Sequence, residues 1–381
     1  MKQLRQSSGV RATLFAQKGL SLVELMVSIV ISLLIMVAIL QLYLDITRTN
    51  DEMAKTNAQI ESGRFTIQLL QDEIAHAGYW GGYVPQFDDL TTSDNPAGVP
   101  PLVQGTPRFA PDPCDITASG WSDDEKDALL GIPIQVFDAV LTGCSMPDKL
   151  AGTDVLVVRH AATAVGCTSP SVCVQVAFCA AEMPGYWLGE GTAVTALQNM
   201  DCATPSPTRR LVSNIYWIKD IGGIPTLVRQ EFGAADAQPL IEGIEGFKVE
   251  LGIDDVSKTG GAVDYSAPVD FAGGTEDRSD PINRGDGVSD SFVRCPTGGC
   301  SFEQLRNVVS VKLYILARNL TATPGYEDPK EYCLESPELD ADDDCTAEAL
   351  FQPDATEKKF KRHLFSTNIR LMNVSGRRET P

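Results

Sequence analysis

Histidine is scarce in this sequence, which contains only His76, His160 and His363. None of them lies in an HExxH or CxxCH pattern, and the sequence has no GxSxG or GxxxxGK[ST] stretch. The sequence therefore lacks the common signatures of metalloproteases, haem attachment, serine hydrolases and nucleotide-binding loops. We therefore expect no catalytic residues, no cofactor and no enzymatic activity. We expect structural roles for the three histidines.

Basic residues are also few: 31 Lys and Arg stand against 51 Asp and Glu, which gives a formal net charge of −20. An acidic chain works against loose binding to nucleic acid or anionic lipid. The densest basic clusters are residues 358–362 and 377–378. A DNA-binding surface normally needs a longer basic stripe, so we expect no nucleic-acid partner.

Proline and glycine are nearly absent from the first part of the chain. The first proline is Pro85, and Gly63 is the one glycine between Leu20 and Ala77. This absence predicts a single helix over about 20–77, because helix breakers would otherwise interrupt it. In its second half, apolar residues recur every seven positions and predict a face packed on a sheet. This stripe consists of Ile46, Met53, Ile60, Ile67 and Ile74.

Charged side chains are missing from residues 20–44, with the single exception of Glu24. At a rise of about 1.5 Å per residue, a helix of this length crosses a hydrocarbon core of about 30 Å. Residues 1–19 contain four basic residues and no acidic one, so the positive-inside rule places them in the cytoplasm. No small-x-small cleavage site follows the apolar run, which indicates that the run is retained. The simplest reading is a plain signal anchor.

Glu24 argues against a plain anchor. A carboxylate in a membrane-spanning segment costs up to a few kcal/mol and usually has a partner there. The apolar run contains no such partner. A cut just before Leu20 would create one, because a free α-amino group ordinarily has a pKa of about 8 and is cationic near neutral pH. This amine could pair with Glu24 of its own chain or of a neighbour, and a pairing between neighbours would set the register of packed subunits.

The stretch Gly19-Leu20-Ser21-Leu22-Val23-Glu24 resembles the processing motif of type IV prepilins. In that family, a membrane-embedded aspartyl peptidase cuts after the glycine and N-methylates the new first residue. The resemblance implies cleavage between Gly19 and Leu20, N-methylation of Leu20, and recruitment of the next subunit by Glu24. Leu20 departs from the family pattern, in which phenylalanine is commonest at this position.

Further stretches are similar to PilW-type minor pilins: residues 63–65, 70–79, 240–247 and 362–373. This resemblance implies a minor pilin that helps to initiate a type IV pilus used in adhesion and twitching motility, and that caps it. The implied partners are other minor pilins, the major pilin, the prepilin peptidase, the inner-membrane assembly platform and a large tip adhesin. The implied location is the bacterial inner membrane, single-pass with a periplasmic head, and then the pilus tip.

We expect an α+β, pilin-like fold, in which a long N-terminal helix packs on an antiparallel β-sheet head with large loop insertions. The expected parts are a cleaved leader at 1–19, a transmembrane half-helix at 20–44, an amphipathic half-helix at 45–78, a loop-rich insertion at 79–152 and a β-sheet head at 153–381. Runs of β-branched and aromatic residues predict seven strands. They are Val155–His160, Val172–Phe178, Leu211–Lys219, Thr226–Glu231, Phe247–Leu251, Val308–Ala317 and His363–Leu371.

Cysteine is absent from the first 113 residues, and all ten cysteines follow. This number indicates an oxidising compartment and disulfides, although connectivity does not follow from sequence alone. Reduced, buried thiols are one alternative. A zinc site is another, but its spacing of six is unlike that of a zinc knuckle. The disulfide candidates are Cys295 with Cys300, Cys333 with Cys345 and Cys114 with Cys144; the zinc candidates are Cys167, Cys173 and Cys179.

An acidic cluster before Cys345 is a weak calcium candidate, with Asp340, Asp342 and Asp344 as its ligands. Carboxylates at alternate positions bind Ca²⁺ in EF-hand loops, but the glycine and glutamate that such a loop needs are replaced here by Cys345 and Phe351. Asp286 and Asp290 are weaker candidates still. A solvated acidic loop is the default, and we predict no metal site.

Three other functions stay open. A pseudopilin of a type II secretion system shares the processing motif and the order of helix and sheet. A DNA-uptake pilin would need a basic surface that this acidic sequence does not predict. A membrane-anchored enzyme has no supporting pattern. Loss of piliation and twitching would support the pilus, and loss of secretion with intact pili would support the pseudopilin.

Overall fold

The structure is a computed structural model, and the chain divides into two compact units, residues 1–54 and 55–381. Helix α1 contributes residues to both units. The described residues are 19, 21–85, 107–115, 120–182, 185–191, 197–265, 267, 269–273, 281–296, 298–336 and 345–378.

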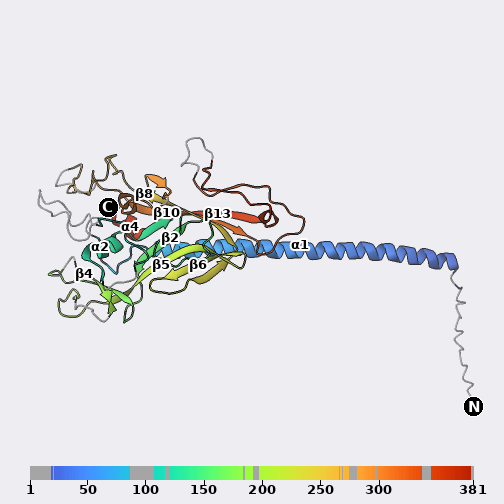
Figure 1. The fold of residues 1–381 in the computed structure, drawn as a ribbon, viewed down its shortest axis with the longest axis horizontal. Coiled ribbons are helices and arrows are strands. Elements are labelled where there is room, and N and C mark those ends of the chain that lie inside the picture. The colour runs from blue at the N-terminus through green and yellow to red at the C-terminus, as the bar shows by residue number, and fades with distance from the viewer. Residues whose placement is uncertain are drawn as a thin grey trace, which may run out of the picture. The chain divides into compact units, whose positions relative to one another are not determined.

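Helix α1 runs from Leu22 to His76 without interruption, a length of 55 residues (Figure 1). Among the described residues it is the one helix that is long and apolar enough to cross a membrane. In the first unit, all side chains over 21–51 are exposed, and most of those over 22–44 are Leu, Ile, Val or Met. Exposed apolar surface on this scale needs a non-aqueous environment.

The second half of α1 packs into the head, but not along the expected heptad stripe. Its buried residues are Gln59, Gly63, Thr66, Leu70 and Ile74. Of the stripe, Ile46 and Met53 are exposed, Ile60 and Ile67 are half-buried, and only Ile74 is fully buried. The expectation of a core-facing stripe is therefore wrong for its first half. The buried face starts later and is more polar than the sequence pattern indicates.

Two residues on this buried face have specific partners. The Gln59 side-chain amide Nε2 donates to the carbonyls of Ala317, at 2.7 Å, and of Lys361, at 3.1 Å. The Phe365 ring lies directly over Gly63, so a Cβ added at Gly63 would overlap that ring. The one glycine in the helix is thus the place where a strand side chain packs against the helix backbone.

The first sheet has seven antiparallel strands, in the order β1-β2-β5-β3-β4, with β6 paired to β5 and β7 paired to β6. Strand β5 is the longest, and it pairs with β2, β3 and β6. The strands are β1 (Ile134–Phe137), β2 (Val155–Ala161), β3 (Val172–Val176), β4 (Tyr186–Glu190), β5 (Thr208–Ile221), β6 (Ile224–Glu231) and β7 (Gln238–Glu242).

The second sheet is antiparallel, in the order β13-β10-β8-β9, and β10 lies inside it as its alternating apolar sequence indicates. A two-stranded ladder joins β11 to β12. The strands are β8 (Ile244–Ile253), β9 (Ser291–Val293), β10 (Val308–Arg318), β11 (Tyr332–Cys333), β12 (Leu350–Phe351) and β13 (Arg362–Arg370). The short helices are α2 (Asp123–Gly131), α3 (Phe302–Leu305), α4 (Met372–Arg378) and the 3₁₀ turn Glu357–Lys359.

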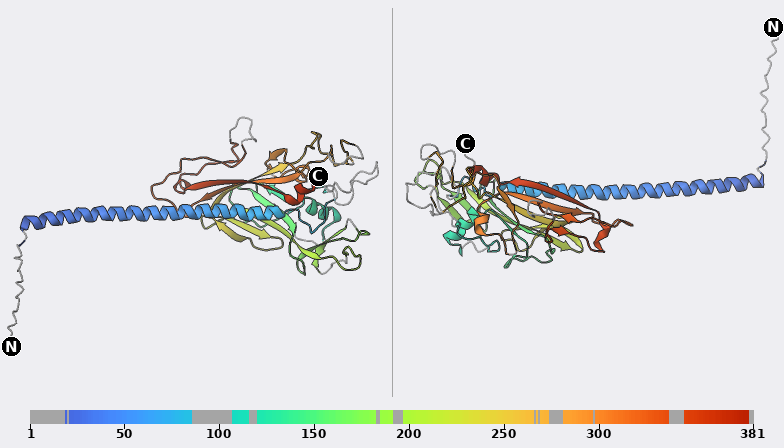
Figure 2. Two further views of the ribbon diagram at one scale, coloured as in Figure 1. Left: turned by 180° about the vertical axis from the view of Figure 1, so that it is seen from behind. Right: turned by 90° about the horizontal axis from the view of Figure 1, so that it is seen from above.

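One hydrophobic core joins the head half of α1 to both sheets. It contains Leu70 and Ile74 of α1, Leu156 of β2, Phe247 of β8 and Leu313 of β10. In Figures 1 and 2 the head-side end of α1 lies between the two sheets. The expected α+β fold, with a long apolar N-terminal helix and antiparallel sheets, is confirmed.

All seven expected strands are present, as β2, β3, β5, β6, β8, β10 and β13. The short strands and helices were not expected. Two of them, α2 and β1, come from the segment 79–152 that we expected to be loop-rich. The capping box of Ser122 and Glu125 begins α2, and β1 pairs along β2. This segment therefore supplies an edge of the first sheet as well as loops.

Candidate functional sites

The first candidate site is the start of α1. Ser21 precedes the helix, and its hydroxyl accepts from the Val23 amide at 3.2 Å. The Glu24 carboxylate accepts from the Ser21 amide at 2.9 Å. These two bonds satisfy amides that a helix start leaves without partners. Glu24 thus has a local role at the helix start in addition to its predicted role in assembly.

The predicted cleavage site lies just before this cap. Gly19 is exposed, whereas Leu20 lies outside the described residues. Glu24 is also exposed, and among the described residues no ion pair involves it. Cleavage between Gly19 and Leu20, and methylation of Leu20, stay predictions.

The two serines inside the apolar half of α1 have partners within the helix. The hydroxyls of Ser28 and Ser32 each donate to the carbonyl four residues earlier. A segment in lipid needs such internal partners because no water is available there. Glu24 differs from these hydroxyls because it carries a charge that no described base neutralises.

The second group of candidates is the cysteines, all of which form disulfides in the structure. Three disulfides join the pairs considered from the sequence: Cys114–Cys144, Cys295–Cys300 and Cys333–Cys345. The other two are Cys167–Cys173 and Cys179–Cys202. The three sulfurs weighed as a zinc site are therefore bonded to other sulfurs and offer no thiolate ligands.

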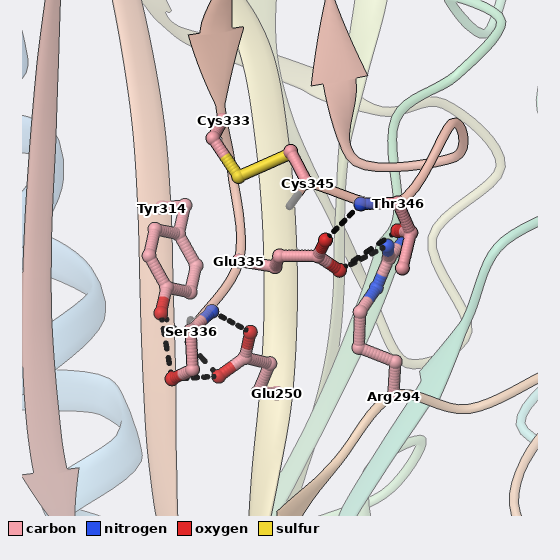
Figure 3. Close-up of a disulfide and its surroundings, with 8 residues drawn as sticks. All are labelled: Glu250, Arg294, Tyr314, Cys333, Glu335, Ser336, Cys345 and Thr346. Carbon is pink, nitrogen blue, oxygen red and sulfur yellow. Dashed lines mark hydrogen bonds and ion pairs between the residues drawn. A yellow bond between two sulfur atoms is a disulfide. The ribbon is translucent and has the colours of Figure 1, made fainter. Parts of the chain in front are cut away.

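Figure 3 shows how the residues beside Cys333–Cys345 are held to the second sheet. Glu335 accepts from the amide and the hydroxyl of Thr346, and it lies 3.4 Å from Arg294 Nη1. The next residue, Ser336, donates its amide and hydroxyl to Glu250 on β8 at 2.6 and 2.8 Å. Both sides of this disulfide are thus anchored by polar contacts.

The calcium candidates receive no support from the described residues. Asp340, Asp342 and Asp344 lie outside them. Asp286 accepts from the Val288 amide at 2.9 Å, and Asp290 accepts from the amides of Asp255 and Val256 at 3.0 and 2.8 Å. Carboxylates used in this way stabilise turns of the protein chain.

The basic clusters considered for DNA binding are partly buried. Arg362 bonds Glu245 at 2.6 Å and Asp328 at 3.3 Å, and all three side chains are almost fully buried. Burial lowers the pKa of Arg362, but these two carboxylates outweigh that effect and hold the pKa above its ordinary value. Arg378 is buried against Asp254 at 3.1 Å. These guanidinium groups hold the head together and are not available to phosphates.

The third candidate is a cavity of about 590 Å³ in the head, between the last turns of α1 and strands β2, β5 and β6. Two of the three histidines meet there: the ring centroids of His76 and His160 are 5.6 Å apart. Glu73 lies beside them, with its Oε1 atom 3.6 Å from His160 Nε2. The sequence analysis missed this cluster, although the Glu-x-x-His spacing of Glu73 and His76 on one helix was a visible signal.

Comparison with known protein families gives one match at the start of α1 and one in the head. Residues 14–40 match the family described as the prokaryotic N-terminal methylation motif. Residues 215–373 match the family described as Type IV Pilus-assembly protein W. Together with the fold, the first match places the chain in the class of type IV pilins. With the second match, the findings support a PilW-type pilin of the type IV pilus.

Solved structures and curated proteins add little more. A type IV-like pilin from Thermus thermophilus is similar over 83% of this chain and 96% of its own chain, at 11% identity and a TM-score of 0.32. So low an identity and TM-score give the likeness no weight in assigning function. No curated protein matches this sequence.

Proposed function

We propose that this chain is a minor pilin that helps to initiate assembly of a type IV pilus and that caps it. The observation that carries this proposal is Glu24. It is the one charged residue in the apolar run, it lies within the residues that match the methylation motif, and no described base pairs with it. A charge in lipid calls for a counter-charge, and the α-amino group released by cleavage before Leu20 would supply it.

In this proposal, the prepilin peptidase removes residues 1–19 and methylates Leu20. The apolar half of α1 holds the subunit in the inner membrane, with the head on the periplasmic side. Glu24 then pairs with the amine of a neighbouring pilin as the assembly platform extrudes the filament. The partners are other minor pilins, the major pilin and a large tip adhesin.

Two features of the head favour a tip position over a repeated shaft position. The second unit comprises residues 55–381, which is large for a subunit that must stack side by side many times. Five disulfides brace it, and disulfides stabilise domains exposed outside the cell. The burial of Arg362 and Arg378 disfavours the alternative of a DNA-uptake pilin.

Complementation of a deletion strain tests this function. The wild-type chain and an Asp45→Ala variant should both restore surface pili and twitching, whereas Glu24→Ala should restore neither. Asp45 is the matched control, because it is an exposed carboxylate on the same helix just beyond the apolar run. Intact pili with lost exoprotein secretion in the deletion strain would instead identify a secretion pseudopilin. Full rescue by Glu24→Ala would contradict the role given to that residue.

A further inference from the structure

The cavity beside the last turns of α1 contains a set of side chains to which the proposed function gives no role. Helix α1 contributes Asp72, Glu73 and His76 to it, β2 contributes His160, and β5 contributes Asn214. All of them lie within the second unit of the chain. Residues from a helix and from a sheet thus converge on one space, and their donor types are imidazole, carboxylate and amide.

Backbone carbonyls determine the protonation pattern of both histidine rings. His160 Nδ1 lies 2.9 Å from the Ala161 carbonyl oxygen, and His76 Nδ1 lies 2.7 Å from the Asp72 carbonyl oxygen. A carbonyl can only accept, so Nδ1 carries the hydrogen in each ring and Nε2 of the neutral ring carries a lone pair. His160 keeps this arrangement in the proposed site, and it is common in histidines that bind metals through Nε2, since the second bond orients the ring.

His160 presents this lone pair in a buried place. The residue is 8% exposed, and its Nε2 atom is buried with no hydrogen-bond partner. The nearest carboxylate atom, Glu73 Oε1, is 3.6 Å away, which is too long for a hydrogen bond. Two ligands of one tetrahedral zinc ion, each about 2.1 Å from the metal, are themselves about 3.4 Å apart. The pair therefore has the spacing of two ligands of a shared ion.

A neighbouring amide orients the Glu73 carboxylate at this position. Its Oε1 atom accepts from Asn214 Nδ2 at 2.5 Å. Carboxylate ligands of metal ions are commonly oriented by a hydrogen bond of this kind.

The surrounding charges permit a cation. The guanidinium groups that line the cavity belong to Arg229 and Arg210, and Glu231 lies 2.6 and 3.8 Å from them. With Glu231 engaged in this way, Asp72 and Glu73 contribute negative charge on the helix side of the cavity. The three carboxylates outnumber the two guanidinium groups, so the cavity lining carries net negative charge, which favours a cation.

We infer that Glu73, His76 and His160 bind one divalent transition-metal ion, with Zn²⁺ the best fit to two imidazoles, one carboxylate and an open position for water. The spacing of Glu73 and His76 puts both on one side of α1, and His160 faces them from β2. The bound ion would tie the last turn of the helix to the sheet. This inference does not depend on the proposed role in the pilus.

One rearrangement is required. The donor atoms of Glu73, His76 and His160 do not all lie within 4.8 Å of one another in the structure. Among the described residues, the one group of three that does so is Cys333, Glu335 and Cys345, and its two sulfurs form a disulfide. His76 must therefore rotate to bring Nε2 into the same shell as Glu73 and His160. Its side chain is exposed, so this rotation breaks one hydrogen bond to a helix carbonyl and displaces no core residue.

The test uses the full oxidised chain in detergent micelles, without a polyhistidine tag and after dialysis against a chelator. Zn²⁺ is titrated by calorimetry, and bound zinc is counted by atomic emission. We expect one zinc ion per chain. His76→Gln and His160→Gln should each weaken zinc binding by at least about tenfold, the effect that loss of even a supporting partner has on such sites. Glu73→Gln should also weaken it, while Asn214 can still bond the new amide.

The third histidine gives a matched control, because His363 is an exposed residue of β13. His363→Gln should bind zinc as the wild type does. Visible absorption of the Co²⁺ form provides a second readout. It should vanish in the His76 and His160 variants and persist in His363→Gln. Circular dichroism checks that each variant is folded, and a thiol assay checks that Cys333 and Cys345 stay oxidised. Equal zinc uptake by the wild type and the folded double variant His76→Gln/His160→Gln would overturn the inference.

Discussion

The polar residues in the two halves of helix α1 differ in their burial and in their partners. In the head half, Gln59 and Thr66 are buried, and Gln59 bonds carbonyls of the second sheet's strand β10 and of the residue before β13. In the apolar half, Glu24 is exposed in the isolated chain, and among the described residues its carboxylate bonds the amide of Ser21. The same unbroken helix therefore has polar residues that hold the head together at one end and, at the other, a carboxylate that contacts no part of the head.

This difference indicates where to look for function. A buried polar residue whose partners lie within the head is explained by stability. A charge within a surface that belongs in lipid is costly to the chain on its own, so its reason must lie in a second molecule. The contrast between Gln59 and Glu24 is the physical basis for assigning assembly to the apolar half of α1.

Of two substitutions in the head half of α1, at Gln59 and at Gly63, the one at Gln59 should lower the free energy of unfolding more. Gln59→Leu keeps the size of the side chain but leaves the carbonyls of Ala317 and Lys361 without this donor. Buried carbonyls that lose a partner cost about 1–3 kcal/mol, so we expect the free energy of unfolding to fall by about 2 kcal/mol. Urea unfolding in detergent reports on the head, because all four tryptophans lie after residue 79.

Two controls sharpen this comparison. Gln71→Leu changes an exposed glutamine on the same half of the helix and should leave the free energy of unfolding nearly unchanged. Glu24→Ala should also leave it unchanged, because Glu24 lies outside the head unit. A loss for Glu24→Ala as large as that for Gln59→Leu would remove the distinction between the two halves.

Adding a methyl group at Gly63 should lower the free energy of unfolding by less than Gln59→Leu does. Alanine favours a helix over glycine by about 1 kcal/mol, but the new Cβ would overlap the Phe365 ring. Overpacking of this kind costs about 1–3 kcal/mol, so Gly63→Ala should destabilise the head by about 1 kcal/mol in the same urea measurement.

The Phe365→Leu background separates these two contributions. Without the ring, Gly63→Ala should become neutral or stabilising, since only the helix preference remains. If Gly63→Ala stabilises the head even when Phe365 is present, the close approach of the ring to the helix is not a constraint on this glycine.

The sequence predicts regular elements well where the signal is local. The absence of proline predicts α1 to within two residues of its observed ends, Leu22 and His76. Alternating apolar residues predict β10, which lies inside its sheet. The heptad stripe does not predict which residues of α1 are buried. The buried face instead includes Gly63, which contacts the Phe365 ring, and Gln59, which bonds the carbonyl of Ala317. Such partners lie hundreds of residues away and leave no periodic trace in the helix.

The candidate sites divide in the same way. The processing motif is a short run of consecutive residues, so it can be recognised without a structure. The pair of His76 and His160 could not be recognised, because the two residues are far apart in the sequence and only the packing of α1 against β2 brings their rings together. A long-range cluster of this kind needs the fold before its chemistry is visible.

The most direct test of the central claim is the intact mass and N-terminal sequence of the chain, recovered both from membranes and from sheared filaments. Processing at the predicted bond gives a chain that begins at Leu20 and carries the mass of one added methyl group, in both fractions. A chain that begins at Met1 in both fractions would leave α1 as a plain membrane anchor and would contradict the assembly role of Glu24.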